Sequence, residues 1–163
     1  MSYRDEVAWL RFGGDTPVNV DRERLRAQLI VHEGLRLFPY TDTVGKLTIG
    51  VGRNISDIGI SRVEALDLLD HDIDRSIQDL HQHIPWVHDL DPVRQAVLVD
   101  MAFNMGWPRL SEFRNTLAAF KRKDWVSAAE GMRASKWAKQ VGQRAVRLRK
   151  MVLSGEWPNE LNA

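Results

Sequence analysis

The sequence predicts an α+β fold that is predominantly helical, with two lobes joined by a long helix. Three observations favour this fold class. A period-2 alternation is confined to residues 35–55, helical spacing of apolar residues occurs on both sides of it, and one uninterrupted helical pattern follows it. At 163 residues the chain can form one domain with a buried core. We expect an N-terminal extension over 1–20 and a single domain over 21–163.

The first predicted element is a helix between Asp21 and Gly34. Asp21 is a suitable N-cap, and glycine is the usual residue just after a helix C-terminus. The apolar residues between them follow helical spacing. Glu33 therefore falls in the last turn of this helix.

Short strands are expected next, over residues 35–55. Apolar side chains alternate with polar residues or glycine on both sides of a stretch rich in turn residues, which are Pro39, Asp42 and Gly45. The economical interpretation is a small antiparallel sheet with Asp42 in a turn. This sheet completes an N-terminal lobe over about residues 21–60.

The rest of the chain predicts helices. Ser61 and Glu64 form a capping box at the start of a connecting helix over about residues 61–84, which ends before Pro85. About 22 residues at 1.5 Å per residue span roughly 33 Å, which is long enough to join two lobes. The C-terminal lobe then covers about residues 85–163. Its predicted helix boundaries are Asp91-Pro92, Gly106, Ser111, Asp124, Gly142 and Gly155.

The composition is that of an ordinary soluble globule, with 44% hydrophobic and 28% charged residues. No apolar run approaches the roughly 18 residues of a membrane helix. Cysteine is absent, and the five histidines show no spacing typical of a zinc site, so we expect no metal and no cofactor. The charged N-terminus lacks the apolar centre of a secretory signal, so we expect the protein to stay where it is made until it is released.

Charge is unevenly distributed along the chain. Residues 1–100 hold 11 basic against 17 acidic residues, and residues 101–163 hold 12 against 5. This asymmetry favours an anionic partner for the C-terminal part, either nucleic acid, a membrane surface or a cell-wall polymer. The alternative is that the two parts of the chain attract each other. No recognised DNA-binding motif accompanies the basic residues, so nucleic acid is not expected.

Glu33 and Asp42 form a candidate catalytic pair. A carboxyl group at a helix C-terminus lies near partly negative carbonyls, which favours its protonated form, whereas a polar turn favours an ionised Asp42. One protonated and one ionised carboxyl group are what glycoside hydrolysis requires. The alternative, on these residues alone, is two solvated surface acids, because 22 acids in 163 residues give such a spacing several times by chance.

The stretch HEGLRLFPYTDTVGKLTIGVGRN, residues 32–54, resembles the N-terminal lobe of the T-even phage lysozymes, glycoside hydrolase family 24. In that family a Glu-Gly-Leu-Arg segment precedes Tyr-x-Asp-Thr-x-Gly and then Thr-Ile-Gly-x-Gly. The similarity continues through ISRVEA, DPVRQAVLVDMAFNMG, SKW, QR and GEW, so that it covers roughly residues 27–157. It implies a lysozyme-like two-lobe fold with the sheet in the N-terminal lobe and helices in the C-terminal lobe.

The resemblance also implies an activity, that of a lysozyme or N-acetylmuramidase. Such an enzyme hydrolyses, with inversion, the β-1,4 bond between N-acetylmuramic acid and N-acetylglucosamine in bacterial peptidoglycan. Glu33 matches the general acid, Asp42 the carboxylate that positions or activates water, and Thr48 the threonine near that water. Arg144 matches a basic residue that would pair with ionised Glu33. The implied substrate-binding residues of the cleft between the lobes are Asn54, Phe103, Asn104 and Thr116.

Two positions depart from the family pattern. Arg53 stands where the family has a histidine, and Asp72 keeps the place of that histidine's ion-pair partner. We therefore expect an Arg53–Asp72 pair with a structural role, contributing about 0 to 1 kcal/mol. Gly131 stands where relatives have a polar side chain that contacts substrate, so that contact is expected to be absent.

Three function classes follow. The first is a muramidase in bacterial lysis by a phage or prophage. The second is a lytic transglycosylase, which cleaves the same bond without water. The third is a virion- or tail-associated wall-binding protein without catalysis. Retention of Asp42 and Thr48 favours hydrolysis, and an intact Glu33 argues against the third class.

We expect a monomer that acts on bacterial peptidoglycan, with an anionic membrane surface as a second candidate partner for the basic C-terminal region. It would stay in the host cytoplasm until it reaches the cell wall through a separate pore protein, or it would be delivered by a virion.

Overall fold

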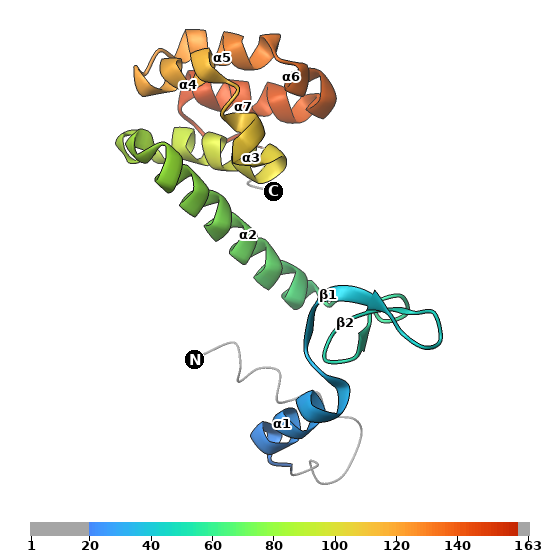
Figure 1. Cartoon of the computed structure of the whole chain (residues 1–163). Helices are drawn as coiled ribbons and strands as arrows, with labels where there is room; N and C mark the ends of the chain where they lie inside the picture. Colours follow the sequence, from blue (N-terminus) through green and yellow to red (C-terminus); the bar gives the residue numbers. More distant parts are fainter. Residues whose placement is uncertain (1–19, 160–163) are drawn as a thin grey trace. The chain divides into compact units, whose positions relative to one another are not determined.

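The structure, a computed structural model, describes residues 20–159 (Figure 1). The chain divides into two compact units, residues 1–61 and residues 62–163. The expected N-terminal extension lies, except for Val20, outside the described residues.

The first helix of the described part of the N-terminal unit is α1 (Arg22–Glu33), and both of its predicted ends are confirmed. The Asp21 side chain accepts a hydrogen bond from the backbone N–H of Arg24 at 3.0 Å, which satisfies one of the free donors of the first turn. At the other end Gly34 has φ +75°, and its N–H donates to the Ile30 carbonyl at 2.9 Å. The helix therefore stops directly after Glu33.

A three-stranded antiparallel sheet follows α1, which confirms the small sheet predicted from the period-2 alternation. Its strands are β1 (Arg36–Thr41), β2 (Leu47–Gly50) and β3 (Arg53–Asn54), in the order β1-β2-β3. Tyr40 pairs with Thr48, and Thr48 pairs with Asn54 on its other side. Thr48 thus lies on the central strand of the sheet.

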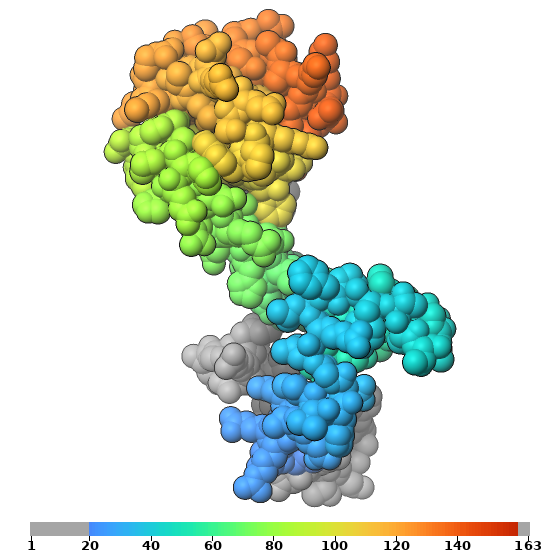
Figure 2. Space-filling view, viewed as in Figure 1, coloured from blue at the N-terminus to red at the C-terminus, as the bar shows by residue number. Residues whose placement is uncertain are grey.

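The C-terminal unit begins with α2 (Arg62–His83), which fulfils the prediction of a long helix ending before Pro85. Leu80 and Ser76 are buried near its C-terminal end, whereas the apolar residues of its N-terminal half are exposed. The C-terminal part of α2 packs against α3 (Pro92–Leu110) (Figures 1 and 2).

Four more α-helices and one 3-10 helix complete this unit. They are η3 (Pro85–Asp89), α4 (Arg114–Lys121), α5 (Trp125–Ala134), α6 (Lys136–Val141) and α7 (Gln143–Ser154). The predicted caps at Asp91, Asp124 and Gly155 are confirmed. At Gly106 the helical backbone is interrupted, as expected, but α3 resumes for one more short turn.

The predicted N-cap at Ser111 is wrong. Its hydroxyl donates to the Pro108 carbonyl at 2.8 Å, so Ser111 closes α3 instead of opening the next helix. The N-cap of α4 is Phe113, which makes no side-chain capping bond. A serine hydroxyl can donate a hydrogen bond to a preceding backbone carbonyl or accept one from a following backbone N–H. The sequence pattern does not distinguish these two possibilities.

The core of the described residues lies in the C-terminal unit. Every buried apolar side chain in residues 20–159 falls between Leu80 and Val152. The largest of those that are fully buried are Phe120, Leu80, Leu98, Met101, Leu110 and Met132. In the N-terminal unit the one buried described residue is Thr48, with 4% of its surface exposed.

Candidate active site

Glu33 is brought to the sheet by the end of α1. Its Oε2 lies so close to Gly52 that a Cβ added to this glycine would be 3.0 Å from it. Gly52 belongs to the turn that connects β2 to β3, and its φ of +69° is one that a side chain would disfavour. Glycine at this position therefore serves two purposes, the turn and the close approach of the Glu33 carboxyl group.

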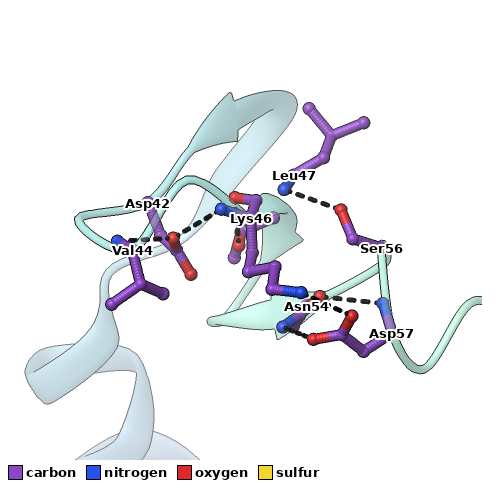
Figure 3. A network of polar contacts seen from close by, with 8 residues as sticks. Asp42, Val44, Lys46, Leu47, Asn54, Ser56 and Asp57 are labelled. Atoms are coloured by element: carbon purple, nitrogen blue, oxygen red, sulfur yellow. Dashed lines mark hydrogen bonds and ion pairs between the residues drawn. The ribbon is translucent and has the colours of Figure 1, made fainter.

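Asp42 is held in the turn between β1 and β2. Its Oδ1 accepts hydrogen bonds from the backbone N–H groups of Val44 at 2.9 Å and Lys46 at 2.8 Å (Figure 3). Its own N–H donates to the Lys46 carbonyl at 2.9 Å. These bonds fix the orientation of the carboxylate. Its Oδ2 accepts no hydrogen bond from the residues that the structure describes, and the side chain is partly exposed.

Thr48 lies on β2 between these two carboxyl groups. Lys46, which binds Asp42, immediately precedes β2, and Gly52, which contacts Glu33, follows it. The Thr48 hydroxyl donates to the Lys46 carbonyl at 3.2 Å, so its single proton is used and its oxygen remains an acceptor. Asp42 therefore contacts the residue just before β2 and Glu33 the turn just after it, with Thr48 on the strand between these two contact points.

Asn54 is part of a polar network beside this strand. Its Nδ2 donates to Oδ2 of Asp57 at 2.9 Å, and its Oδ1 accepts from the Asp57 N–H at 3.1 Å. Oδ1 of Asp57 forms an ion pair with Nζ of Lys46 at 2.9 Å, and the Ser56 hydroxyl accepts the Leu47 N–H (Figure 3). Asn54 thus supports the loop that carries Lys46, and Lys46 in turn holds Asp42.

Lys46 and Asp57 were not among the residues predicted from the sequence to form the site. Their ion pair joins the β1–β2 turn to the loop after β3. An Asn-x-x-Asp spacing at residues 54–57 is the available sequence signal, because an asparagine carbonyl often accepts a backbone N–H a few residues further along. That spacing does not identify Lys46 as the ion-pair partner of Asp57.

Arg53 and Asp72 have separate partners within their own units. Nη1 of Arg53 donates to the Gly59 carbonyl at 3.3 Å. Asp72 forms an ion pair with Arg75 at 3.3 Å, one turn further along α2. The expected Arg53–Asp72 pair would join the two units and stays a prediction.

Phe103 and Arg144 line one groove of the C-terminal unit. The groove has a volume of about 970 Å³, and Phe103 is 42% exposed in it. Arg144 is oriented by Asp100, since its Nε donates to Oδ1 of Asp100 at 2.7 Å and its Nη2 to the Asp100 carbonyl at 3.3 Å. Within this unit the partner of Arg144 is therefore Asp100.

Thr116 lines a different cavity, of about 860 Å³, and is 4% exposed. A Cβ on Gly131 would overlap the Thr116 hydroxyl, so Thr116 fills the space that a side chain at 131 would need. Asn104 does not line either hollow; its Oδ1 accepts the indole N–H of Trp137 at 2.8 Å. Within the C-terminal unit, Phe103, Asn104 and Thr116 therefore do not share one of these two cavities, and their role in substrate binding stays a prediction.

Two further findings bear on the expected chemistry. The described residues include no cluster of three or more potential metal-ligating side chains. No helix in residues 20–159 has the length and apolar character needed to cross a membrane.

Comparison with known proteins matches the chain to a family model. The phage lysozyme model matches residues 31–151. The chain is 30% identical over 151 residues to the pre-baseplate central spike protein Gp5 of Enterobacteria phage T4, with 76% of this chain and 26% of that protein covered. The chain thus spans about a quarter of the length of Gp5.

Two relatives are matched over nearly their whole length. Probable T4-type lysozyme 2 of Dictyostelium discoideum is 25% identical over 154 residues, with 76% of this chain and 90% of that protein covered. Probable T4-type lysozyme 1 of the same organism is 25% identical over 160 residues, covering 80% and 94%. With a family model that matches most of its length, and with Glu33, Asp42 and Thr48 arranged around one strand of its small sheet, the chain belongs to the phage lysozyme family.

Proposed function

We propose that this protein is a lysozyme-type peptidoglycan hydrolase that cleaves the β-1,4 bond between N-acetylmuramic acid and N-acetylglucosamine. The observation that carries the proposal is the arrangement around β2, with an oriented carboxylate before the strand, a second carboxyl group at the turn after it, and a threonine oxygen on the strand between them. Membership of the phage lysozyme family supports the substrate class.

In the proposed reaction Glu33 is the general acid. It donates its proton to the glycosidic oxygen as the bond to the anomeric carbon breaks. Its carboxyl group is exposed, so it can approach a bound glycan. After the step Glu33 is ionised, and solvent restores its proton.

Asp42 accepts a proton from the attacking water, for which its Oδ2 is available. The Thr48 oxygen accepts the second hydrogen of that water and so fixes its position. In this mechanism a water molecule lies between the two carboxyl groups, and the product has the inverted configuration, as the family resemblance implies.

The activity is tested by the loss of turbidity of purified peptidoglycan. We expect Glu33→Gln to lower the rate by about 10²- to 10⁴-fold, the usual contribution of a general acid. Asp42→Asn should lower it to a similar extent. Glu23→Gln is the matched control, because Glu23 lies in the first turn of the same helix. An undiminished rate in Glu33→Gln would exclude the proposed role of Glu33.

Delivery to the wall is a separate proposal. One of the relatives is named as a spike protein of a phage pre-baseplate, and this favours carriage on a virion as an alternative to release from the cytoplasm. Immunoblotting of purified virions with an antibody to this chain separates the two routes. A virion-carried enzyme gives a constant signal per particle, and a released one gives none.

We further propose that the basic C-terminal region binds an anionic membrane surface. Arg147 and Lys150 are exposed on α7, and neither forms an ion pair with a described residue. Binding of Glu33→Gln to vesicles with and without anionic lipid tests this. Equal binding to both kinds of vesicle, or none to either, would contradict the proposal.

A further inference from the structure

Two histidines outside the candidate active site face each other where α2 gives way to η3. Nδ1 of His81 lies 2.7 Å from Nε2 of His88, and the two rings meet edge to face with centroids 4.9 Å apart. Both side chains are exposed. The fold therefore presents two imidazole nitrogens at a point that solvent and dissolved ions can reach.

The facing nitrogens can share either a proton or a metal ion. An ordinary hydrogen bond requires one of them to carry a hydrogen. If His81 keeps its hydrogen on Nε2 and His88 on Nδ1, each ring remains neutral and both facing nitrogens offer a lone pair. Two imidazole nitrogens bound to one ion lie about 2.9 to 3.4 Å apart, given metal–nitrogen distances near 2.0 to 2.1 Å. The two nitrogens, now 2.7 Å apart, would have to separate by about 0.2 to 0.7 Å.

We propose that His81 and His88 form a two-ligand site for a divalent transition-metal ion, with Zn²⁺ as the reference case. Imidazole nitrogen suits Zn²⁺, Ni²⁺ and Cu²⁺, whereas Mg²⁺ and Ca²⁺ select oxygen ligands. The described residues supply no third ligand in a cluster, so water completes the coordination. The site is open and exchangeable, unlike the closed four-ligand sites that hold structural zinc.

Binding of a metal ion at this site would stabilise the folded state. The ion would join the last turns of α2 to η3, two elements that are held together in the folded protein. An ion that binds only where both histidines are correctly placed favours the folded state by mass action. The site is independent of Glu33 and Asp42, so the inference does not rest on the proposed glycosidase activity.

Thermal unfolding of the untagged full-length protein tests the proposal. We expect saturating Zn²⁺ to raise the unfolding temperature by about 2 to 5 °C and the same concentration of Mg²⁺ to leave it unchanged. His81→Asn and His88→Asn should each abolish the Zn²⁺ shift.

His83→Asn is the matched control. The His83 ring stacks on the Trp107 ring, with centroids 4.5 Å apart, and its Nδ1 contacts the Asp79 carbonyl. His83 therefore has partners other than His81 and His88. This variant should keep the full Zn²⁺ shift. Calorimetric titration of the wild type should find one Zn²⁺ per chain. Absence of a Zn²⁺ shift in the wild type, or its persistence in both His81→Asn and His88→Asn, would overturn the proposal.

Discussion

At the scale of single residues, the contact between Glu33 and Gly52 determines where the proposed general acid lies. Glu33 ends a helix, and nothing in a helix end alone would direct its carboxyl group toward the sheet. The glycine permits the approach because it has no Cβ, and its φ of +69° permits the turn. The position of the acid therefore depends on a residue that carries no chemistry.

Gly52→Ala should lower activity more than it lowers stability. A methyl group would displace the Glu33 carboxyl group by a few tenths of an ångström, which should lower the rate by less than the roughly 10²-fold cost of a 1 Å misplacement. Gly50→Ala is the control, because Gly50 has the same φ of +69° but open space around its Cβ position. Both variants should lose about 1 to 2 kcal/mol of stability. Equal activities in the two variants would contradict this account of Gly52.

The Thr116–Gly131 contact predicts a rescue. Gly131→Ala should destabilise the protein by about 1 to 3 kcal/mol, even though alanine is normally favoured in helices, because its methyl group would overlap the Thr116 hydroxyl. Thr116→Ala in the same chain should recover part of that loss. Urea unfolding of the two single variants and the double variant measures this coupling. Strictly additive effects would show that the two residues do not interact.

At the scale of elements, Arg94 joins the start of α3 to the end of α7. Its Nε donates to the Val152 carbonyl at 2.9 Å, and its Nη1 pairs with Asp91 at 3.0 Å. Its guanidinium group also lies over the Trp125 ring, 4.2 Å from the centroid. Positive charge is favourable beside the carbonyls of a helix C-terminus. One side chain thus ties three elements together.

Arg94→Lys should therefore be destabilising although the charge is kept. An ammonium group cannot reproduce the forked donors or the planar stacking on Trp125. We expect a loss of about 1 to 3 kcal/mol in denaturant unfolding. Arg147→Lys, at an exposed position of α7, is the control and should change stability by less than about 0.5 kcal/mol.

The contact between Asp91 and Arg94 should make the stability of the protein depend on pH. Burial alone would raise the pKa of Asp91, but the hydrogen bonds and charge of Arg94 outweigh it and hold the pKa below its usual value. A depressed folded-state pKa means that the contribution to stability is complete above the unfolded value of about 3.9 and is lost as the pH falls through the lower folded value.

Asp91→Asn tests this linkage. Asparagine can still cap α3, so the variant removes mainly the charge. It should be less stable than the wild type at neutral pH, and the difference should narrow as the pH falls below about 4. Asp89→Asn is the control, because Asp89 is an exposed position of η3. A difference between wild type and Asp91→Asn that stays constant down to pH 2 would refute the proposed linkage.

At the scale of the whole molecule, the two units differ in what stabilises them. The buried apolar side chains of the described residues belong to the C-terminal unit, whereas the sheet of the N-terminal unit is organised by turns and polar contacts around Asp42 and Asp57. The proposed catalytic residues and the buried core therefore belong to different parts of the chain.

The C-terminal unit should fold alone. A fragment of residues 62–163 contains every buried apolar residue described here, so it should be helical and unfold cooperatively on heating. Leu98→Ala in this fragment should cost about 2 to 5 kcal/mol, because Leu98 is fully buried. Leu153→Ala, which alters an exposed leucine, should cost far less. Gradual, non-cooperative melting of the fragment would contradict this division of roles.

Much of this arrangement could be predicted from local sequence signals. Asp21, Asp91, Asp124 and Gly155 mark helix ends because capping is a matter of one side chain and its nearest backbone groups. The alternation in residues 35–55 predicts the sheet for the same local reason. The signals failed at Ser111, whose hydroxyl had two backbone partners within reach.

Contacts between distant residues could not be predicted in this way. The ion pair of Lys46 with Asp57, the pairing of Arg144 with Asp100, and the packing of Thr116 on Gly131 each join segments that the chain brings together only on folding. The resemblance of residues 32–54 to the phage lysozymes indicated Glu33, Asp42 and Thr48 as the candidate site. Their arrangement around β2 could be established only from the structure.

The central claim, hydrolysis by Glu33 and Asp42, is tested most directly by mass spectrometry of the products released from purified peptidoglycan in water enriched in ¹⁸O. The account predicts muropeptides with a free reducing N-acetylmuramic acid end that carries one ¹⁸O atom, and no such products with Glu33→Gln. Products with a 1,6-anhydro end and no ¹⁸O would contradict the account and would identify a lytic transglycosylase.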